Sequence, residues 1–125
     1  MKFHLDDDQL TIELEGFESL WAFRRSLILP RANITRVAWH SDPTPLDLLL
    51  RTGGTSLPGV LLAGNFRGQG MKQFLYVWRP QGLWRRQASN VLIIDLQGFN
   101  YARVVISCKK EDAAPVLAWA GEPVA

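Results

Sequence analysis

The residues that could carry out chemistry are few, and they follow no catalytic pattern. His40, Ser41 and Asp42 supply the three side-chain types of a hydrolase triad. Neighbours in sequence seldom form such a triad, however, and the chain has no nucleophile-elbow motif around a serine. We therefore predict that His40 lies at the end of a strand and that the chain is not an enzyme.

The carboxylates and the single thiol give the same indication. The acidic groups nearest the N-terminus are Asp6, Asp7, Asp8, Glu13, Glu15 and Glu18. Adjacent aspartates in a turn are more often solvated than catalytic. Cys108 is the only cysteine, which excludes an intramolecular disulfide. The chain has only two histidines, His4 and His40, and with Cys108 they do not form a zinc-ligand spacing. We predict no catalytic residue, no metal and no cofactor.

A glycine-rich stretch runs from Arg51 to Phe66, and six of the ten glycines lie between Gly53 and Gly70. Glycine concentrates where a backbone takes positive φ or where something approaches it closely. A phosphate-binding loop would need Gly-Lys-Ser/Thr between a strand and a helix, and this stretch lacks it. We therefore predict turns around a short buried strand, Val60–Ala63, with structural turn residues at Gly53, Gly54, Pro58, Gly59 and Gly64.

Tryptophan stands directly before arginine in two places. The candidate interaction residues are Trp78, Arg79, Trp84, Arg85 and Arg86. Tryptophan and arginine are enriched at the centres of protein interfaces, so these residues predict a protein-binding surface, with self-association to a homo-oligomer as one form of it. The same residue types could stack on single-stranded nucleic acid. The chain has no other nucleic-acid motif, and we do not expect that partner.

Charge is distributed unevenly along the chain. The net charge is +2, yet residues 1–18 hold six acidic groups and one lysine, whereas residues 24–110 hold thirteen Lys or Arg and three Asp. A cationic body could attract an anionic partner. Peripheral binding to anionic membrane lipid, or to another anionic ligand, through arginine-rich strands is therefore the alternative to protein binding.

Length and composition predict one globular domain over residues 1–125. Hydrophobic residues make up 47% of the chain and charged residues 21%, close to soluble globular averages. No apolar run approaches the roughly 20 residues of a membrane-spanning helix. The N-terminus carries Asp6–Asp8 where a signal peptide would need its apolar segment. We expect a cytoplasmic protein without a transmembrane segment.

The elements expected to position these residues are mostly strands. Alternating apolar residues and short apolar runs predict strands at 2–5, 10–14, 26–29, 33–39, 46–51, 71–79, 91–96 and 103–107, with a helix as the alternative at 46–51, within a total of seven to nine. A short helix is predicted near residues 17–23 and a second at the C-terminus, with Asp112 as its cap, Pro115 in its first turn and Gly121 after it. The predicted class is mainly β, an antiparallel barrel or sandwich closed by the terminal helix.

This order of segments resembles an uncharacterised bacterial group of domains with the pleckstrin-homology-like (PH-like) fold. The resemblance is carried by Leu27–Pro30 with Asn33–Val37, by Thr55–Phe66, by the Phe74 strand, and by Val91–Leu96 before Tyr101. It covers roughly residues 5–120 and lies in strand and turn patterns without a catalytic signature. It implies two nearly orthogonal antiparallel sheets capped by a C-terminal helix.

What the resemblance implies about function is a binding role, because PH-like folds include lipid binders, peptide binders and oligomerising modules. Members that bind phosphoinositides use basic residues around the first loop between strands. That loop is Asp6–Gln9 in this chain and would repel a phosphorylated headgroup. We therefore expect a non-enzymatic interaction domain that binds a protein partner or itself.

Overall fold

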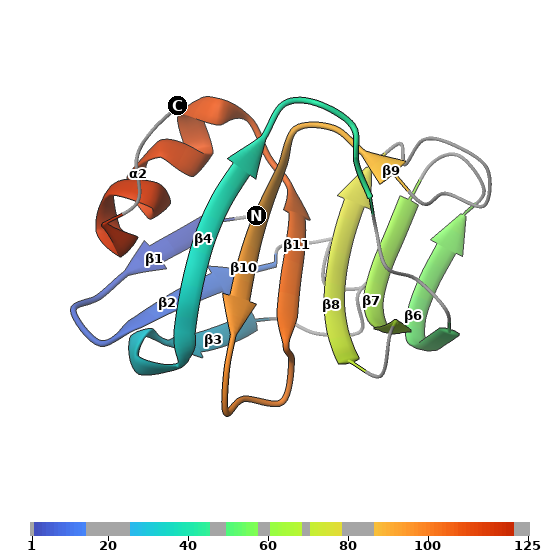
Figure 1. The fold of residues 1–125 in the computed structure, drawn as a ribbon, viewed down its shortest axis with the longest axis horizontal. Helices are drawn as coiled ribbons and strands as arrows, with labels where there is room; N and C mark the ends of the chain where they lie inside the picture. The colour runs from blue at the N-terminus through green and yellow to red at the C-terminus, as the bar shows by residue number, and fades with distance from the viewer. Residues whose placement is uncertain are drawn as a thin grey trace.

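The computed structural model describes residues 2–14, 26–45, 50–57, 61–68, 71–78 and 87–121, which form β-sheets and a C-terminal helix (Figure 1). One sheet has three strands in the order β1-β2-β3, and the other has six in the order β4-β10-β11-β8-β7-β6. Strands β5 and β9 form a short separate pair. The strands are β1 Lys2–Leu5, β2 Gln9–Glu13, β3 Ser26–Pro30, β4 Ile34–His40, β5 Thr44–Pro45, β6 Leu50–Leu57, β7 Leu61–Gly68, β8 Met71–Trp78, β9 Gln87–Ala88, β10 Val91–Leu96 and β11 Arg103–Ser107. The single turn of 3-10 helix η1 spans Arg31–Asn33, and helix α2 spans Lys110–Ala120.

The three-stranded sheet buries one face and exposes the other. Leu10 and Ile12 in β2 and Leu27 and Leu29 in β3 are almost completely buried, whereas Ile28, between the last two, is 48% exposed. Successive side chains of a strand point to opposite faces, so this alternation fixes which face meets the core. The strands predicted in this part of the sequence are confirmed.

The central strands of the six-stranded sheet are buried on both faces. In β11, Val104 and Ile106 belong to the main core, while Val105 between them packs with Leu75 and Ile93 in a second apolar cluster on the opposite face. This explains why residues 74–77 of β8, 91–94 of β10 and 104–106 of β11 are continuously apolar, since a strand covered on both sides has no solvent face to alternate with.

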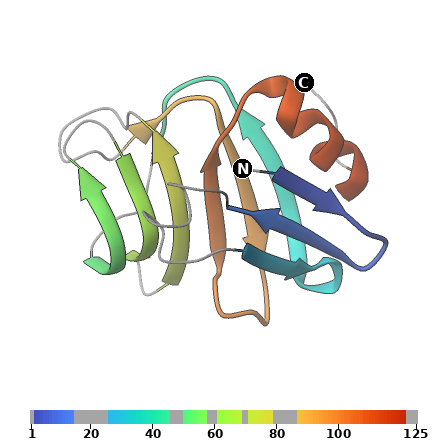
Figure 2. The ribbon, with the colours of Figure 1, turned by 180° about the vertical axis from the view of Figure 1, so that it is seen from behind.

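The two sheets form two layers, with α2 at one end of the space between them. Figures 1 and 2 show the strands of the small sheet running across those of the large sheet, and α2 beside β4 and β1. Ala113, Val116 and Leu117 of the helix are buried in the main core. The predicted mainly β class with one C-terminal helix is confirmed.

The terminal helix begins three residues earlier than the sequence predicted. Its N-cap is Lys109 and not Asp112, whose backbone N–H already donates to the Lys109 carbonyl at 3.1 Å. Pro115 lies inside the helix and not in its first turn. Gly121 does terminate the helix, in the left-handed conformation with φ 78°.

Two features of the sheets differ from the prediction. The described strands number eleven and not seven to nine, although β5 and β9 have only two residues each. The large sheet is mixed and not wholly antiparallel, because β11 pairs with β8 in parallel, with Val104 opposite Phe74 and Ile106 opposite Tyr76. β10 lies on the far side of β11 from β8, and β11 returns antiparallel to β10 and parallel to β8. The helix predicted near residues 17–23 lies outside the described residues.

The glycine-rich stretch forms strands where the sequence predicted turns. Gly53 and Gly54 lie inside β6, with a register shift between Arg51 and Gly53, and Gly54 pairs with Gly64 inside β7. The strand predicted for residues 60–63 therefore continues to Gly68. Gly64 has φ 114°, a conformation open to glycine because it has no Cβ. Pro58 and Gly59 lie outside the described residues.

Gly98 and Gly121 allow a matched test of backbone strain. Both have left-handed φ, 73° and 78°, but a Cβ on Gly98 would lie 3.3 Å from Asn33 Nδ2 whereas one on Gly121 would meet nothing within 4 Å. Asn33 Nδ2 donates to the carbonyls of Gln97 at 2.8 Å and Gly98 at 3.2 Å. We expect Gly121→Ala to lower the free energy of unfolding by about 1 kcal/mol, and Gly98→Ala to lower it further. Urea unfolding measures both; an equal loss at the two positions would contradict the role of Asn33.

Candidate functional site

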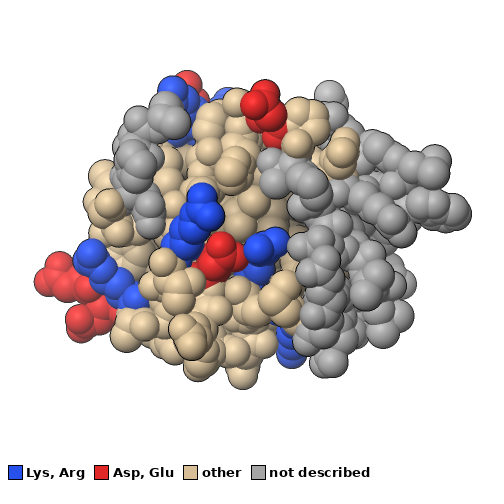
Figure 3. Space-filling view, in the orientation of Figure 1, with Lys and Arg blue, Asp and Glu red and all other residues tan. Residues whose placement is uncertain are grey.

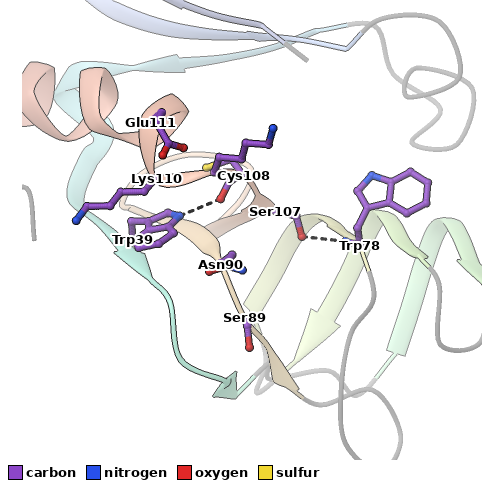
Figure 4. Close-up of a pocket in the computed structure, with 9 residues that line it drawn as sticks. Trp39, Trp78, Ser89, Asn90, Ser107, Cys108, Lys110 and Glu111 are labelled. Carbon is purple, nitrogen blue, oxygen red and sulfur yellow. Dashed lines mark hydrogen bonds between the residues drawn. The ribbon is translucent and has the colours of Figure 1, made fainter.

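A hollow of about 560 Å³ lies where β4, β8 and β11 end and where β10 and α2 begin (Figure 4). Its lining combines two indoles with neutral polar and charged side chains. The lining residues are Trp39, Trp78, Ser89, Asn90, Ser107, Cys108, Lys109, Lys110 and Glu111. A concave site with a few polar groups among aromatic ones is the usual form of a ligand site.

Two hydrogen bonds to the backbone of Cys108 connect three of the residues that line this hollow. The Trp39 indole N–H donates to the Cys108 carbonyl at 3.0 Å, and the Cys108 N–H donates to the Asn90 carbonyl at 3.1 Å. Asn90 has φ 54°, a left-handed conformation that asparagine tolerates better than most residues, at the point where the chain enters β10. The turn before β10 and the start of α2 are thereby connected through Cys108.

Trp78 presents an exposed aromatic surface on a fixed backbone. Among the described residues, Trp78 is one of two large hydrophobic residues that are exposed, and 45% of its surface is accessible. Its backbone N–H donates to Ser107 Oγ at 2.9 Å, and its ring meets the buried Tyr76 ring edge-on with centroids 6.1 Å apart. Figure 4 shows the indole standing apart from the other labelled side chains. The residue is held in position without being buried.

The Cys108 thiol is neutral at physiological pH. Burial raises its pKa to about 12, with a smaller contribution from the negative charge of Asp112. The thiolate is the nucleophilic form of cysteine, so this environment suppresses covalent chemistry. Cys108 follows β11 and packs against the main core.

The charged groups of the hollow are two lysines and one glutamate. Lys109 and Lys110 contribute two positive charges and Glu111 one negative charge. The lining residues include no histidine that could activate Ser89 or Ser107. His40 lies half-buried at the end of β4, opposite Val91, and Ser41 and Asp42 are exposed beyond it.

The structure describes only one of the five predicted interaction residues. Trp78 lies in the hollow, whereas Arg79, Trp84, Arg85 and Arg86 fall outside the described residues. The sequence prediction did not include Trp39, Asn90 or the lysines at the start of α2. No local signal marks them, because they come from three segments that meet only after the large sheet has formed.

Charges of both signs alternate on the outer face of the large sheet. Asp95 in β10 lies opposite Arg36 in β4 and Arg103 in β11, and Arg103 Nε lies 2.9 Å from Asp95 Oδ1. Figure 3 shows an acidic side chain between basic ones on this face. The described part of the face is therefore not a uniformly basic surface for an anionic partner.

Three further observations bear on the class of site. Within the described ranges, no group of three His, Cys, Asp or Glu side chains is placed to hold a metal ion. No helix among those residues is long and apolar enough to cross a membrane. Comparison of the chain with known protein families, with characterised proteins and with solved structures finds no significant match to any of them.

Proposed function

We propose that this chain is a non-enzymatic interaction domain that binds protein, including further copies of itself, through the hollow beside Trp78. The observation that supports this most directly is the state of Trp78, which is 45% exposed although its backbone is tied to Ser107. Tryptophan is the residue most enriched among those that dominate binding energy at interfaces. An anchor that is already in place costs little conformational entropy when it is covered.

The absence of enzymatic activity is part of the same proposal. The one thiol of the hollow has a pKa of about 12, and its two hydroxyl groups belong to Ser89 and Ser107, the latter already accepting a hydrogen bond from Trp78. A nucleophilic serine needs a base within hydrogen-bond reach. The lining residues offer lysines and a glutamate for that role and no histidine, which supports binding over catalysis.

Membership of the PH-like group also stays a prediction. Its support is the mainly β architecture of two sheets with one C-terminal helix. The parallel pairing of β8 with β11 differs from the all-antiparallel sheets that the resemblance implies.

Trp78→Ala tests the proposed function, with Ile28→Ala as its matched control. Ile28 is similarly exposed, at 48%, but lies on β3 and does not line the hollow. We expect the weight-average mass of the unmodified protein to rise between about 10 and 500 μM in sedimentation velocity, which covers the range of a weak interface. Trp78→Ala should weaken that association about tenfold or more, and Ile28→Ala should leave it unchanged. A protein that stays monomeric throughout contradicts self-association.

A further inference from the structure

A group of acidic side chains lies at the opposite end of α2 from the hollow. Asp6, Asp7 and Asp8 form the turn between β1 and β2, and all three are exposed. Figure 3 shows acidic side chains gathered at the edge of the molecule where Figure 1 places this turn. We call these three residues the acidic turn.

The backbone of the acidic turn is held in place by three hydrogen bonds. The Asp6 N–H donates to the Gln9 carbonyl at 3.0 Å, the Arg31 N–H donates to the Asp8 carbonyl at 2.8 Å, and the Trp119 indole N–H donates to the Asp6 carbonyl at 2.7 Å. The carbonyl groups of Asp6 and Asp8 therefore accept hydrogen bonds within the molecule, while the three carboxylates are exposed. Arg31 also lies over the Trp119 ring at 5.2 Å, so it offsets part of the local negative charge.

Helix α2 separates this turn from the hollow within one molecule. Trp119, near the end of the helix, contacts the turn, whereas Lys110 and Glu111, at its beginning, line the hollow. Nine residue steps of α-helix span about 14 Å. The acidic turn and the lysines of the hollow therefore cannot meet in the same chain.

We propose that the acidic turn of one molecule docks in the hollow of a second copy beside Trp78, with its carboxylates at Lys109 and Lys110. This rests on the proposed self-association and names its two surfaces. The lining has a formal charge of +1 from two lysines and one glutamate, and the turn carries three aspartates. Opposite charges favour this pairing over contact between two hollows or between two acidic turns.

The contact is heterologous, because each molecule contributes a different surface. Such contacts produce rings or open chains instead of closed two-fold dimers. A turn seated in a hollow of about 560 Å³ covers less area than a standard stable interface, so the association is weak and salt-sensitive. Glu111 opposes it, since its carboxylate faces the same hollow as the lysines.

Complementation between two variants tests the proposal. Variant A carries Lys109→Gln and Lys110→Gln, and variant B carries Asp6→Asn, Asp7→Asn and Asp8→Asn. Each change keeps the size of the side chain close to the original, and each position is exposed, so circular dichroism should show an unchanged fold. In sedimentation velocity at low salt, each variant alone should associate about tenfold more weakly than the unmodified protein. An equimolar mixture should recover association and stop at a dimer, because A retains the acidic turn and B retains the hollow.

Glu111→Gln tests the pairing in the opposite direction, because it is expected to strengthen self-association instead of weakening it. Removal of this carboxylate should tighten self-association about two- to fivefold, since it removes a repulsive charge from the docking site. Weaker or unchanged association in Glu111→Gln would overturn the proposed pairing.

The outcomes separate this inference from the proposed function. If the unmodified protein associates and Trp78→Ala abolishes the association, while variant B behaves like the unmodified protein, the proposed function stands and the acidic turn is not the occupant. A mixture of A and B that remains monomeric also overturns the pairing. A protein that is monomeric at all concentrations overturns both. Lysine-dependent sedimentation with phosphatidylserine vesicles in place of self-association would assign the hollow to lipid headgroups and overturn the inference.

Discussion

Ile12→Ala is expected to lower the free energy of unfolding by about 2–5 kcal/mol. Ile12 has no exposed surface and lies on the inner face of the small sheet, opposite Leu27 in the neighbouring strand. Truncation there removes buried methylene and methyl groups and leaves a cavity between the two sheets. Urea denaturation monitored by tryptophan fluorescence measures the change in the midpoint.

Ile28→Ala is the matched control for this prediction. The two isoleucines lie on adjacent strands of one sheet, but Ile28 points away from the core and is 48% exposed. We expect its truncation to cost less than about 1 kcal/mol, mostly through lost β propensity. Similar losses at both positions would contradict the packing of this sheet against the large one.

The Cys108 thiol is expected to react about 30- to 100-fold more slowly with iodoacetamide in the folded protein than in the unfolded chain at about pH 8. Its pKa rises from an ordinary value of 9.0 to about 12, first because it is buried and second because Asp112 is near. The shift reduces the thiolate fraction about 1000-fold, and the greater nucleophilicity of the more basic thiolate restores only part of this. Quenched alkylation followed by mass spectrometry measures both rates, with concentrated guanidinium chloride supplying the unfolded reference.

The same pKa predicts how stability depends on pH. The folded state keeps its thiol proton while the unfolded state loses it above about pH 9, so the free energy of unfolding falls as pH rises from 9.0 toward about 12. Cys108→Ala should show a shallower decline than the unmodified protein over this interval. Rapid alkylation of the folded protein, or equal pH profiles for the two proteins, would mean that the thiol is more solvated than its surroundings indicate.

Trp78 shows how far the sequence alone predicted the candidate site. Its place in an alternating aromatic strand and its residue type made it an interaction candidate, and it does line the hollow. Trp39 and Asn90 could not be chosen in this way. Their roles depend on hydrogen bonds to and from Cys108, which lies 69 residues from Trp39 in the chain.

Gly53, Gly54 and Gly64 show the limit of composition. Glycine readily adopts turn conformations, so a local cluster of glycines predicts turns. Pairing between β6 and β7 places Gly54 opposite Gly64 and supplies the strand hydrogen bonds that local propensity would not favour. Tertiary context overrides propensity most easily where side chains contribute least.

The sequence by itself determined most strands outside the glycine-rich stretch and the presence and end of the terminal helix. The alternation of apolar residues, as in Leu10 to Ile12 and Leu27 to Leu29, and the helix-ending Gly121 are local signals that act through burial and backbone conformation. Only the tertiary structure decided that β11 pairs with β8 in parallel and that Trp39, Trp78 and Lys110 surround one hollow. These are contacts between distant segments, and their free energy depends on how the sheets pack and not on the order of neighbouring residues.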